Sequence, residues 1–304
     1  DYAAVLQNWP VALTPETRGW LKRNLQKGTL RNVEGAVRIA DGAPPIFGVS
    51  YDFEGAALRY LPDMPLLDGA AGRASFHDKR FVIAVTDGYT ETSHGRLDVG
   101  GSVFTIPDSD ATPSTIELDI EAAGPVSAAL DLLERPPFDL LEDVTFAPGD
   151  ISGALEASIG LSFLTGRDPS NDDLGLRVSA HLSDLETDDI AQGRLVTSER
   201  LDLRGDAEGL RIDGPMAIDG VPAQATLRRP LGAGAETAPA RIAGVVTISP
   251  ETLSALSVVL PDGTVSGSTE ATFEIDVPKE GPPLMRMESG LGGIGLAITT
   301  ACWD

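Results

Sequence analysis

Apolar and polar residues alternate one by one along most of this chain, which is the period of a β-strand with one buried and one exposed face. Residues 115–121 (Thr-Ile-Glu-Leu-Asp-Ile-Glu) place aliphatic side chains on one side and mostly acidic ones on the other. Residues 174–182 alternate in the same way. Shorter stretches repeat the pattern at 37–39, 49–53, 97–99, 201–203, 210–212, 223–227 and 273–277. The pattern predicts an all-β fold of many strands.

Asp-Gly pairs stand near the ends of many of these stretches and predict tight turns between strands. Short strands that are joined by tight turns pair antiparallel. Regular alternation also predicts sheets with one dry face and one wet face. We therefore expect antiparallel sheets. The pairs lie at 41–42, 87–88, 213–214, 219–220 and 262–263.

Three short helices are expected beside prolines that suit a helix N-terminus. The first covers about residues 15–27, with Thr14 as its cap, and the others begin near Pro125 and near Pro250. A short helix ahead of a strand that begins with glycine would cover an open end or edge of a sheet. The three glycines are Gly28, Gly149 and Gly263.

The chain also repeats itself. Thr-Pro-Glu-Thr at 14–17 and Ser-Pro-Glu-Thr at 249–252 lie at the same distance ahead of a Gly-Thr pair, and residues 149–153 resemble residues 263–267. Repeats favour an extended surface over a single pocket. We predict one continuous, elongated domain with repeat units at 1–134, 135–248 and 249–304, and we expect it to be an excerpt of a longer protein.

Composition narrows the possible functions. Hydrophobic residues make up 42% of the chain but aromatic residues only 5%, so its apolar surfaces are mainly aliphatic. The net charge of −23 disfavours nucleic-acid binding and polybasic attachment to anionic lipids. The single cysteine, Cys302, can form neither an internal disulfide nor a metal cluster. No apolar run of about 20 residues predicts a membrane span.

Catalytic and metal motifs are weak. His77, His94 and His181 lack the spacing of a zinc site, and no Gly-x-Ser-x-Gly elbow is present. Residues 290–295 fit Gly-x-Gly-x-x-Gly, but a strand-like segment follows where a phosphate site needs a helix. The acidic loop at 168–173 lacks the ligand spacing of a calcium loop. We predict no enzyme activity, no cofactor and no metal.

Rows of aliphatic side chains remain, and they have two interpretations. They form either an ordinary core between two sheets or a groove that holds alkyl chains. Composition alone favours the closed core.

A series of short motifs resembles AsmA-like bacterial envelope proteins, closest to the YhdP type. The motifs are spread over nearly the whole chain. They are Asn8-Trp9-Pro10, Arg18-Gly19-Trp20-Leu21, Tyr60-Leu61-Pro62, Pro65-Leu66, Gly124-Pro125, Leu130-Asp131-Leu132-Leu133, Pro136-Pro137, residues 179–184 (Ser-Ala-His-Leu-Ser-Asp) and Gly220-Val221-Pro222.

The resemblance implies an elongated periplasmic sheet that folds lengthwise into a trough with an apolar inner face. It implies a protein anchored in the inner membrane by a segment absent from this chain. It also implies movement of phospholipid toward the outer membrane, with membrane proteins as partners at either end. No catalytic residue comes with the family.

The leading hypothesis is therefore a non-enzymatic conduit for phospholipid acyl chains in the Gram-negative envelope. The alternative is a structural or protein-binding β-sandwich module without lipid, and a third class is a carbohydrate-active enzyme with two converging carboxylates. The predicted groove lining is Val37, Ile39, Tyr51, Phe53, Leu97, Val99, Ile116, Leu118, Ile120, Leu176, Val178, Leu182, Leu203, Ile212, Phe273 and Ile275.

Overall fold

The chain folds as an all-β protein, and its computed structural model describes residues 15–42, 45–136, 138, 146–165, 175–189, 193–231, 238–258, 260–261, 263–278 and 284–297. The helices in this part are α2 (Pro15–Asn24), α3 (Val126–Glu134) and α4 (Pro250–Ala255), with a 3₁₀ turn η1 (Pro148–Asp150). The strands are β1 (Leu25–Arg38), β2 (Ile46–Leu58), β3 (Leu67–His77), β4 (Arg80–Thr92), β5 (Gly95–Asp98), β6 (Val103–Ile106), β7 (Thr115–Pro125), β8 (Ser152–Leu164), β9 (Gly175–Thr187), β10 (Val196–Asp206), β11 (Gly209–Ile218), β12 (Val221–Pro230), β13 (Ala240–Ile248), β14 (Val265–Gly267), β15 (Thr269–Val277), β16 (Leu284–Glu288) and β17 (Ile294–Leu296).

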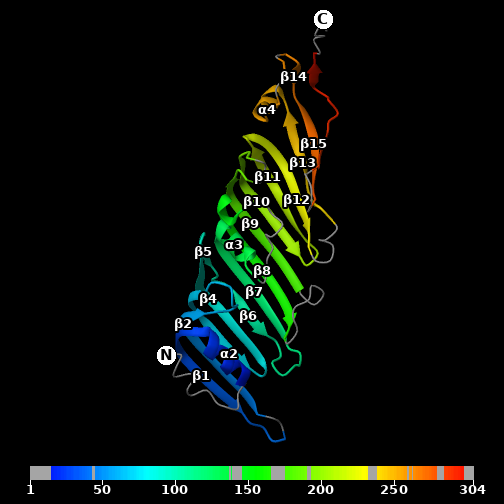
Figure 1. Cartoon of the computed structure of the whole chain (residues 1–304). Helices are drawn as coiled ribbons and strands as arrows, with labels where there is room; N and C mark the ends of the chain where they lie inside the picture. Colours follow the sequence, from blue (N-terminus) through cyan, green and yellow to red (C-terminus); the bar gives the residue numbers. More distant parts are fainter. Residues whose placement is uncertain are drawn as a thin grey trace. The chain divides into compact units, whose positions relative to one another are not determined.

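One large antiparallel sheet confirms the predicted fold class (Figure 1). Its strand order is β1-β2-β3-β4-β5-β7-β8-β9-β10-β11-β12-β13-β15-β16, with β6 paired to both β4 and β7. Strands β14 and β17 form a separate pair. The chain divides into two compact units, unit 1 (Asp1–Glu142 and Leu155–Ser179) and unit 2 (Asp143–Ala154 and Ala180–Asp304). The three repeat units expected from the sequence remain a prediction.

The strands of unit 1 are in a register that separates apolar from charged side chains. Directly opposed residues in neighbouring strands point to the same face of a sheet. A row of opposed residues therefore shows which side chains share a face, and the row through Leu118 is entirely apolar. This row runs Tyr51, Ala74, Ile83, Phe104 and Leu118, from β2 to β7.

The adjacent row on the other face of unit 1 is charged at both ends. It runs Asp52, Arg73, Ala84, Val103 and Asp119 through the same strands. Unit 1 thus has an apolar face and a charged face, as the alternation predicts.

Unit 2 is built in the same way. Its apolar row runs Leu203, Ile212, Leu227, Ile242, Ile275 and Met285, from β10 to β16. The residue next to each of these along the strand faces the opposite side, as with Asp213 beside Ile212 and Arg241 beside Ile242. We refer to these two surfaces as the apolar face and the charged face of each unit.

Two of the five Asp-Gly pairs do not form the predicted turns. Asp87-Gly88 lies inside β4, and Asp213-Gly214 lies inside β11. The strand register shifts at Asp87, and Gly88 and Gly214 have φ of 154° and 157°. A glycine with positive φ suits a bulge as well as a turn, so the dipeptide alone does not distinguish them. The pairs at 41–42 and 219–220 do form turns, and residue 262 lies outside the described residues.

Glycines in corresponding positions of the two units allow a neighbouring strand to approach closely. A Cβ atom on Gly124 would contact the carbonyl oxygen of Arg96 and lie 3.0 Å from Leu97 Cδ2. A Cβ atom on Gly214 would lie 2.6 Å from the carbonyl oxygen of Arg200 and 2.8 Å from Leu201 Cδ2. Leu97 and Leu201 are both buried, so these glycines permit close packing at a buried position of each unit.

The helices begin where the sequence predicts, but the first ends early. Helix α2 stops at Asn24, and β1 begins at Leu25, which pairs with Leu58. The prediction of a helix over 15–27 is therefore wrong at its C-terminal end, because the residues just before Gly28 pair with β2 instead of continuing the helix. Helix α4 is capped by Ser249, whose side chain accepts a hydrogen bond from the Thr252 amide.

The glycine-rich run at 290–295 overlaps β17, and most of the strand-like segment predicted after it lies outside the described residues. The acidic loop at 168–173, most of the loop at 232–240 and Cys302 lie outside the described residues.

Substituting Gly124 or Gly214 by Ala should lower the free energy of unfolding by about 1–3 kcal/mol, because the added methyl group forces two strands apart at a positive φ. Urea unfolding followed by circular dichroism measures the change. Gly290→Ala is the control, since no atom lies within 4 Å of a Cβ at that position. Equal stability of all three variants would contradict the packing described here.

Candidate functional site

Most of the predicted lining residues come together on the apolar faces. In unit 1 these are Val37, Tyr51, Phe53, Leu97, Ile116, Leu118, Ile120, Leu176 and Val178. In unit 2 they are Leu182, Leu203, Ile212, Phe273 and Ile275. Ile39 and Val99 lie one residue beyond the ends of β1 and β5, so strand pairing does not fix their side. Contact of any of these residues with a lipid stays a prediction.

Side-chain contacts fix the faces of β8 and β9. Ser158 donates a hydrogen bond of 3.0 Å to Glu121 on the charged face of unit 1, so its neighbour Ile159 lies on the apolar face. His181 Nδ1 lies 2.5 Å from the Asp202 carboxylate on the charged face of unit 2, which places Leu182 on the apolar face. His181 is exposed, as its polar position in the alternation predicts.

The apolar faces contain aromatic side chains, of which Phe81 and Phe104 are not among the predicted lining residues. Phe81 and Phe104 meet edge to face with ring centroids 6.1 Å apart. Phe53 stands over Gly72 and Phe273 over Gly244, where an added Cβ would lie 2.9 Å and 2.7 Å from the rings. The sequence contains the signal for Phe81, because this residue precedes Ile83 by two positions in the same alternation.

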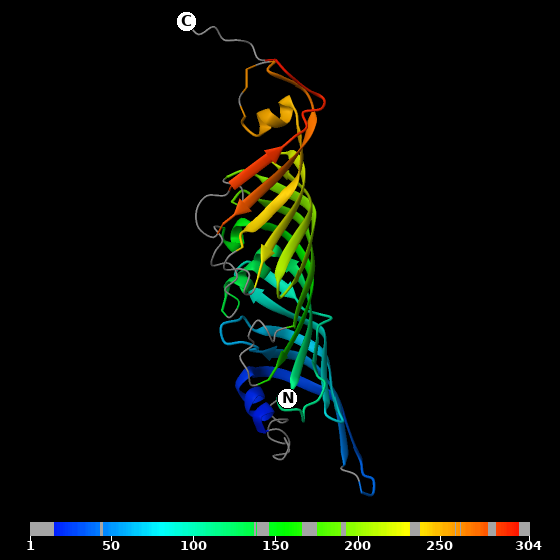
Figure 2. The same cartoon turned by 90° about the vertical axis from the view of Figure 1, so that its right-hand side faces the viewer.

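Much of this apolar surface is accessible. At the turn end of the β1–β2 hairpin, which extends away from the rest of unit 1 (Figure 2), Val37 and Phe47 on the apolar face are 58% and 51% exposed. In unit 2, Met285 and Met287 on β16 are also exposed. Among the described residues, no large side chain is fully buried. Exposed apolar surface of this kind usually marks a binding site.

Helix α3 covers the other end of the strands in unit 1. Val126 and Ala128 are buried, and so are Thr90 and Leu97 on the strands that α3 contacts. Asp131 holds the helix in place through hydrogen bonds. Its side chain is only 8% exposed. The Ser93 hydroxyl donates to it at 2.9 Å and the Arg135 guanidinium at 3.0 Å. Burial alone raises the pKa of Asp131, but these hydrogen bonds outweigh it and hold the pKa below its ordinary value of 3.8.

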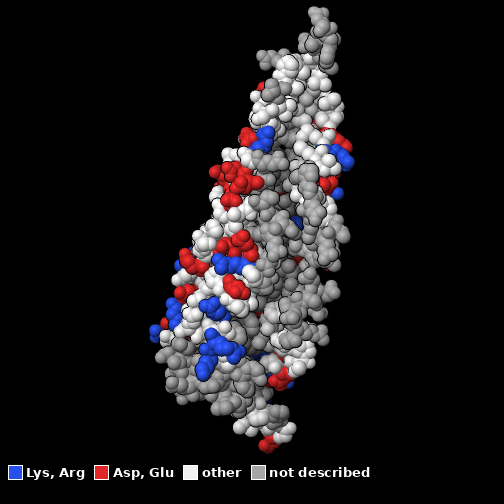
Figure 3. All heavy atoms as spheres, in the orientation of Figure 1, with Lys and Arg blue, Asp and Glu red and all other residues white. Residues whose placement is uncertain are grey.

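On the charged faces, ion pairs connect neighbouring strands. In unit 1, Arg31 pairs with Glu54 at 2.7 Å, and in unit 2, Arg241 pairs with Asp276 at 2.8 Å. Acidic and basic side chains lie beside one another on the face seen in Figure 3. A hydrogen bond from Arg211 holds the pKa of Asp213 below its usual range. These pairs are solvated, so they fix register and solubility more than stability.

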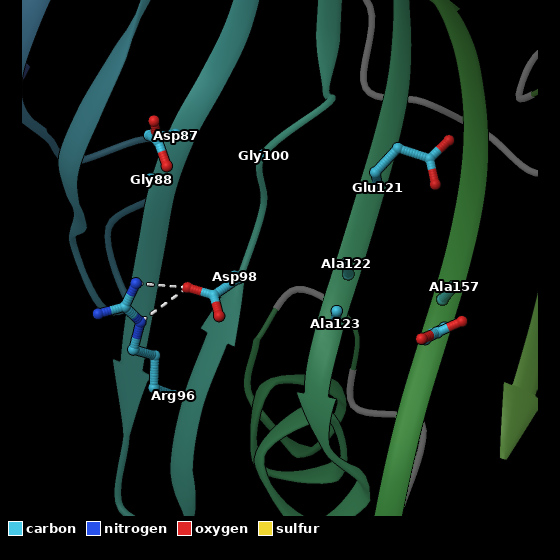
Figure 4. A pocket seen from close by; sticks show the side chains of 10 residues that line it. Asp87, Gly88, Arg96, Asp98, Gly100, Glu121, Ala122, Ala123 and Ala157 are labelled. Atoms are coloured by element: carbon cyan, nitrogen blue, oxygen red, sulfur yellow. Dashed lines mark hydrogen bonds and ion pairs between the residues drawn. The ribbon is translucent and has the colours of Figure 1, made fainter. Parts of the chain in front are cut away.

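A depression of about 490 Å³ lies on the charged face of unit 1. Asp87, Asp98, Glu121 and Glu156 line it, together with Arg96 (Figure 4). Asp98 already accepts hydrogen bonds from Arg96, and Glu121 accepts one from Ser158. Asp87 and Glu156 make no hydrogen bond or ion pair with a described residue. Across the described part of the chain, no three His, Cys, Asp or Glu side chains are grouped to hold a metal ion.

Comparisons with protein-family models, with curated proteins and with solved structures found no match. Within the described ranges, no helix has the length and apolar character needed to cross a membrane. The apolar faces are therefore the candidate functional site on structural grounds alone.

Replacing Asp131 with Asn should destabilise unit 1 by about 1–3 kcal/mol at neutral pH, because a buried charge-assisted network is lost. The folded-state pKa of Asp131 is lowered, so its ionised form stabilises the fold above the ordinary pKa, and that contribution disappears as the pH falls through the lowered value. The difference from the unsubstituted protein should therefore shrink below about pH 4.

Thermal unfolding between neutral and acidic pH measures this difference. Glu134→Gln, at an exposed position of the same helix, is the control. A constant difference at every pH would contradict the role given to the Asp131 charge.

Proposed function

We propose that the apolar faces bind the alkyl chains of lipids and that the protein is a non-enzymatic lipid-transfer segment of the Gram-negative cell envelope. The observation that carries the proposal is the strand register, which collects aliphatic and aromatic side chains on one face of each unit.

The energetics support an alkyl ligand. Each methylene removed from water contributes about 0.8 kcal/mol, so complete burial of a 16-carbon chain contributes roughly 13 kcal/mol. An open sheet face buries one side of the chain and yields part of that value. Apolar contact has no preferred direction, so a chain can slide along the face without breaking specific bonds.

The location in the envelope is supported by the sequence resemblance to AsmA-like proteins of the YhdP type. On this proposal the chain works in the periplasm, between inner- and outer-membrane proteins at the ends of a longer, anchored protein, and carries phospholipid. The alternative is a structural or protein-binding β-sandwich without lipid. A sandwich needs a second sheet packed on the apolar face, and the only other sheet in the described residues is the short β14–β17 pair.

Photo-crosslinking tests the proposal at neighbouring positions on opposite faces. A photoreactive residue at Leu118, on the apolar face, should label added phospholipid several-fold more than one at Asp119, on the charged face. The same contrast is expected in β2 between Val49, which is more exposed than Leu118, and its neighbour Ser50 on the charged face. Labelled lipid is quantified by mass spectrometry.

Equal labelling of both faces in both strands would refute the proposal. Circular dichroism of each variant ensures that only folded protein is compared.

A further inference from the structure

Arg229 is exceptional among the residues of the apolar faces. Register pairs it with Leu210 in β11, next to the pair formed by Ile212 and Leu227. At every other described position of the large sheet that the register places on the apolar faces, the side chain is uncharged. A charge placed among aliphatic side chains requires an explanation, because such positions are costly for ions.

Arg229 also has no ionic partner in the described part of the chain, although its side of β12 is half-buried. No ion pair or hydrogen bond joins its guanidinium to any described residue. On the charged face of the same unit, the exposed Arg204 and Arg286 also lack a partner among the described residues, whereas other arginines are paired. Arg211 pairs with Asp213 at 2.6 Å and Arg241 with Asp276 at 2.8 Å.

The position of Arg229 along the strand suits an amphiphile. Arg229 is the penultimate residue of β12, which ends at Pro230, so its guanidinium group lies at the margin of the apolar face. Inward from it, Leu227 continues into the row of Ile242 and Ile275 across β13 and β15. A positive group at the margin and an aliphatic row beside it match a molecule with an anionic head and an alkyl tail.

We propose that Arg229 binds the anionic headgroup of a lipid whose alkyl chain lies on the apolar face of unit 2. The inference rests on the proposed function and deepens it, because it names anionic lipids as the preferred cargo. A guanidinium donates two parallel hydrogen bonds to a phosphate, and such charge-assisted bonds are strong beside apolar surface. The negative charge of the lipid headgroup then pairs with the guanidinium of Arg229, which has no acidic partner among the described residues.

The test compares two fluorescent lipids that differ only in the presence of the phosphate group. Labelled lysophosphatidate has a phosphate, and the labelled monoacylglycerol with the same chain has a neutral hydroxyl. Both are titrated into the whole protein at neutral pH. Arg229→Gln should weaken lysophosphatidate binding about tenfold and leave monoacylglycerol binding unchanged.

Arg228→Gln is the matched control. Arg228 is the preceding residue of β12, carries the same charge and lies on the charged face opposite Arg211 and Arg241. It should change the affinity for neither lipid. Millimolar inorganic phosphate should not displace lysophosphatidate, because the chain provides most of the affinity.

The inference is overturned if Arg229→Gln weakens neither lipid, if it weakens both equally, or if inorganic phosphate competes with lysophosphatidate. In those cases binding of both lipids to the unsubstituted protein would still support the apolar face as a lipid site. If the unsubstituted protein binds neither lipid, the proposed function itself fails, and the inference fails with it.

Discussion

The structure depends on strand register, because register decides which side chains share a face. Side chains alternate strictly along a strand, so a slip of one residue between two strands would exchange apolar and charged positions. The rows through Leu118 in unit 1 and through Ile242 in unit 2 show that no such exchange occurs between the paired strands. Ion pairs between strands, such as Arg31 with Glu54, favour this register from the opposite face.

Bulges are compatible with this separation. In β4 the register shifts between the pairs made by Val85 and Asp87, which places one extra residue in the strand. Beyond the extra residue, the side chains of β4 again alternate between the same two faces. Thr90 pairs with Leu97, and both are buried beneath α3. Bulges bend a strand locally and strengthen its twist, so they shape the sheet without mixing its faces.

The sequence predicted the faces well because alternation is a local property. The alternation around Ile116, Leu118 and Ile120 needed no knowledge of the partner strand. The pairs Asp87-Gly88 and Asp213-Gly214 were predicted as turns but lie inside strands, because the same dipeptide with a positive φ also occurs within a strand. Only the pairing of distant strands distinguishes the two.

Arg229 was missed for a related reason. It follows Ala225 and Leu227 at the correct spacing, yet Arg228 beside it makes the pair look like an ordinary charged strand end. The register with Leu210 reveals that the two arginines face opposite sides. The sequence pattern likewise does not identify the molecule that covers the apolar faces, because a closed core and a lipid-binding surface require the same alternation.

Methyl-detected NMR with a spin-labelled fatty acid tests the central claim most directly, since it compares apolar residues on both faces of the same sheet. Ile83 and Ile242 lie on the apolar faces, whereas Val82 and Val245 lie on the charged faces. The account predicts that the spin label broadens the methyl signals of the two isoleucines and leaves those of the two valines sharp. Equal broadening of all four, or broadening of none, would contradict it.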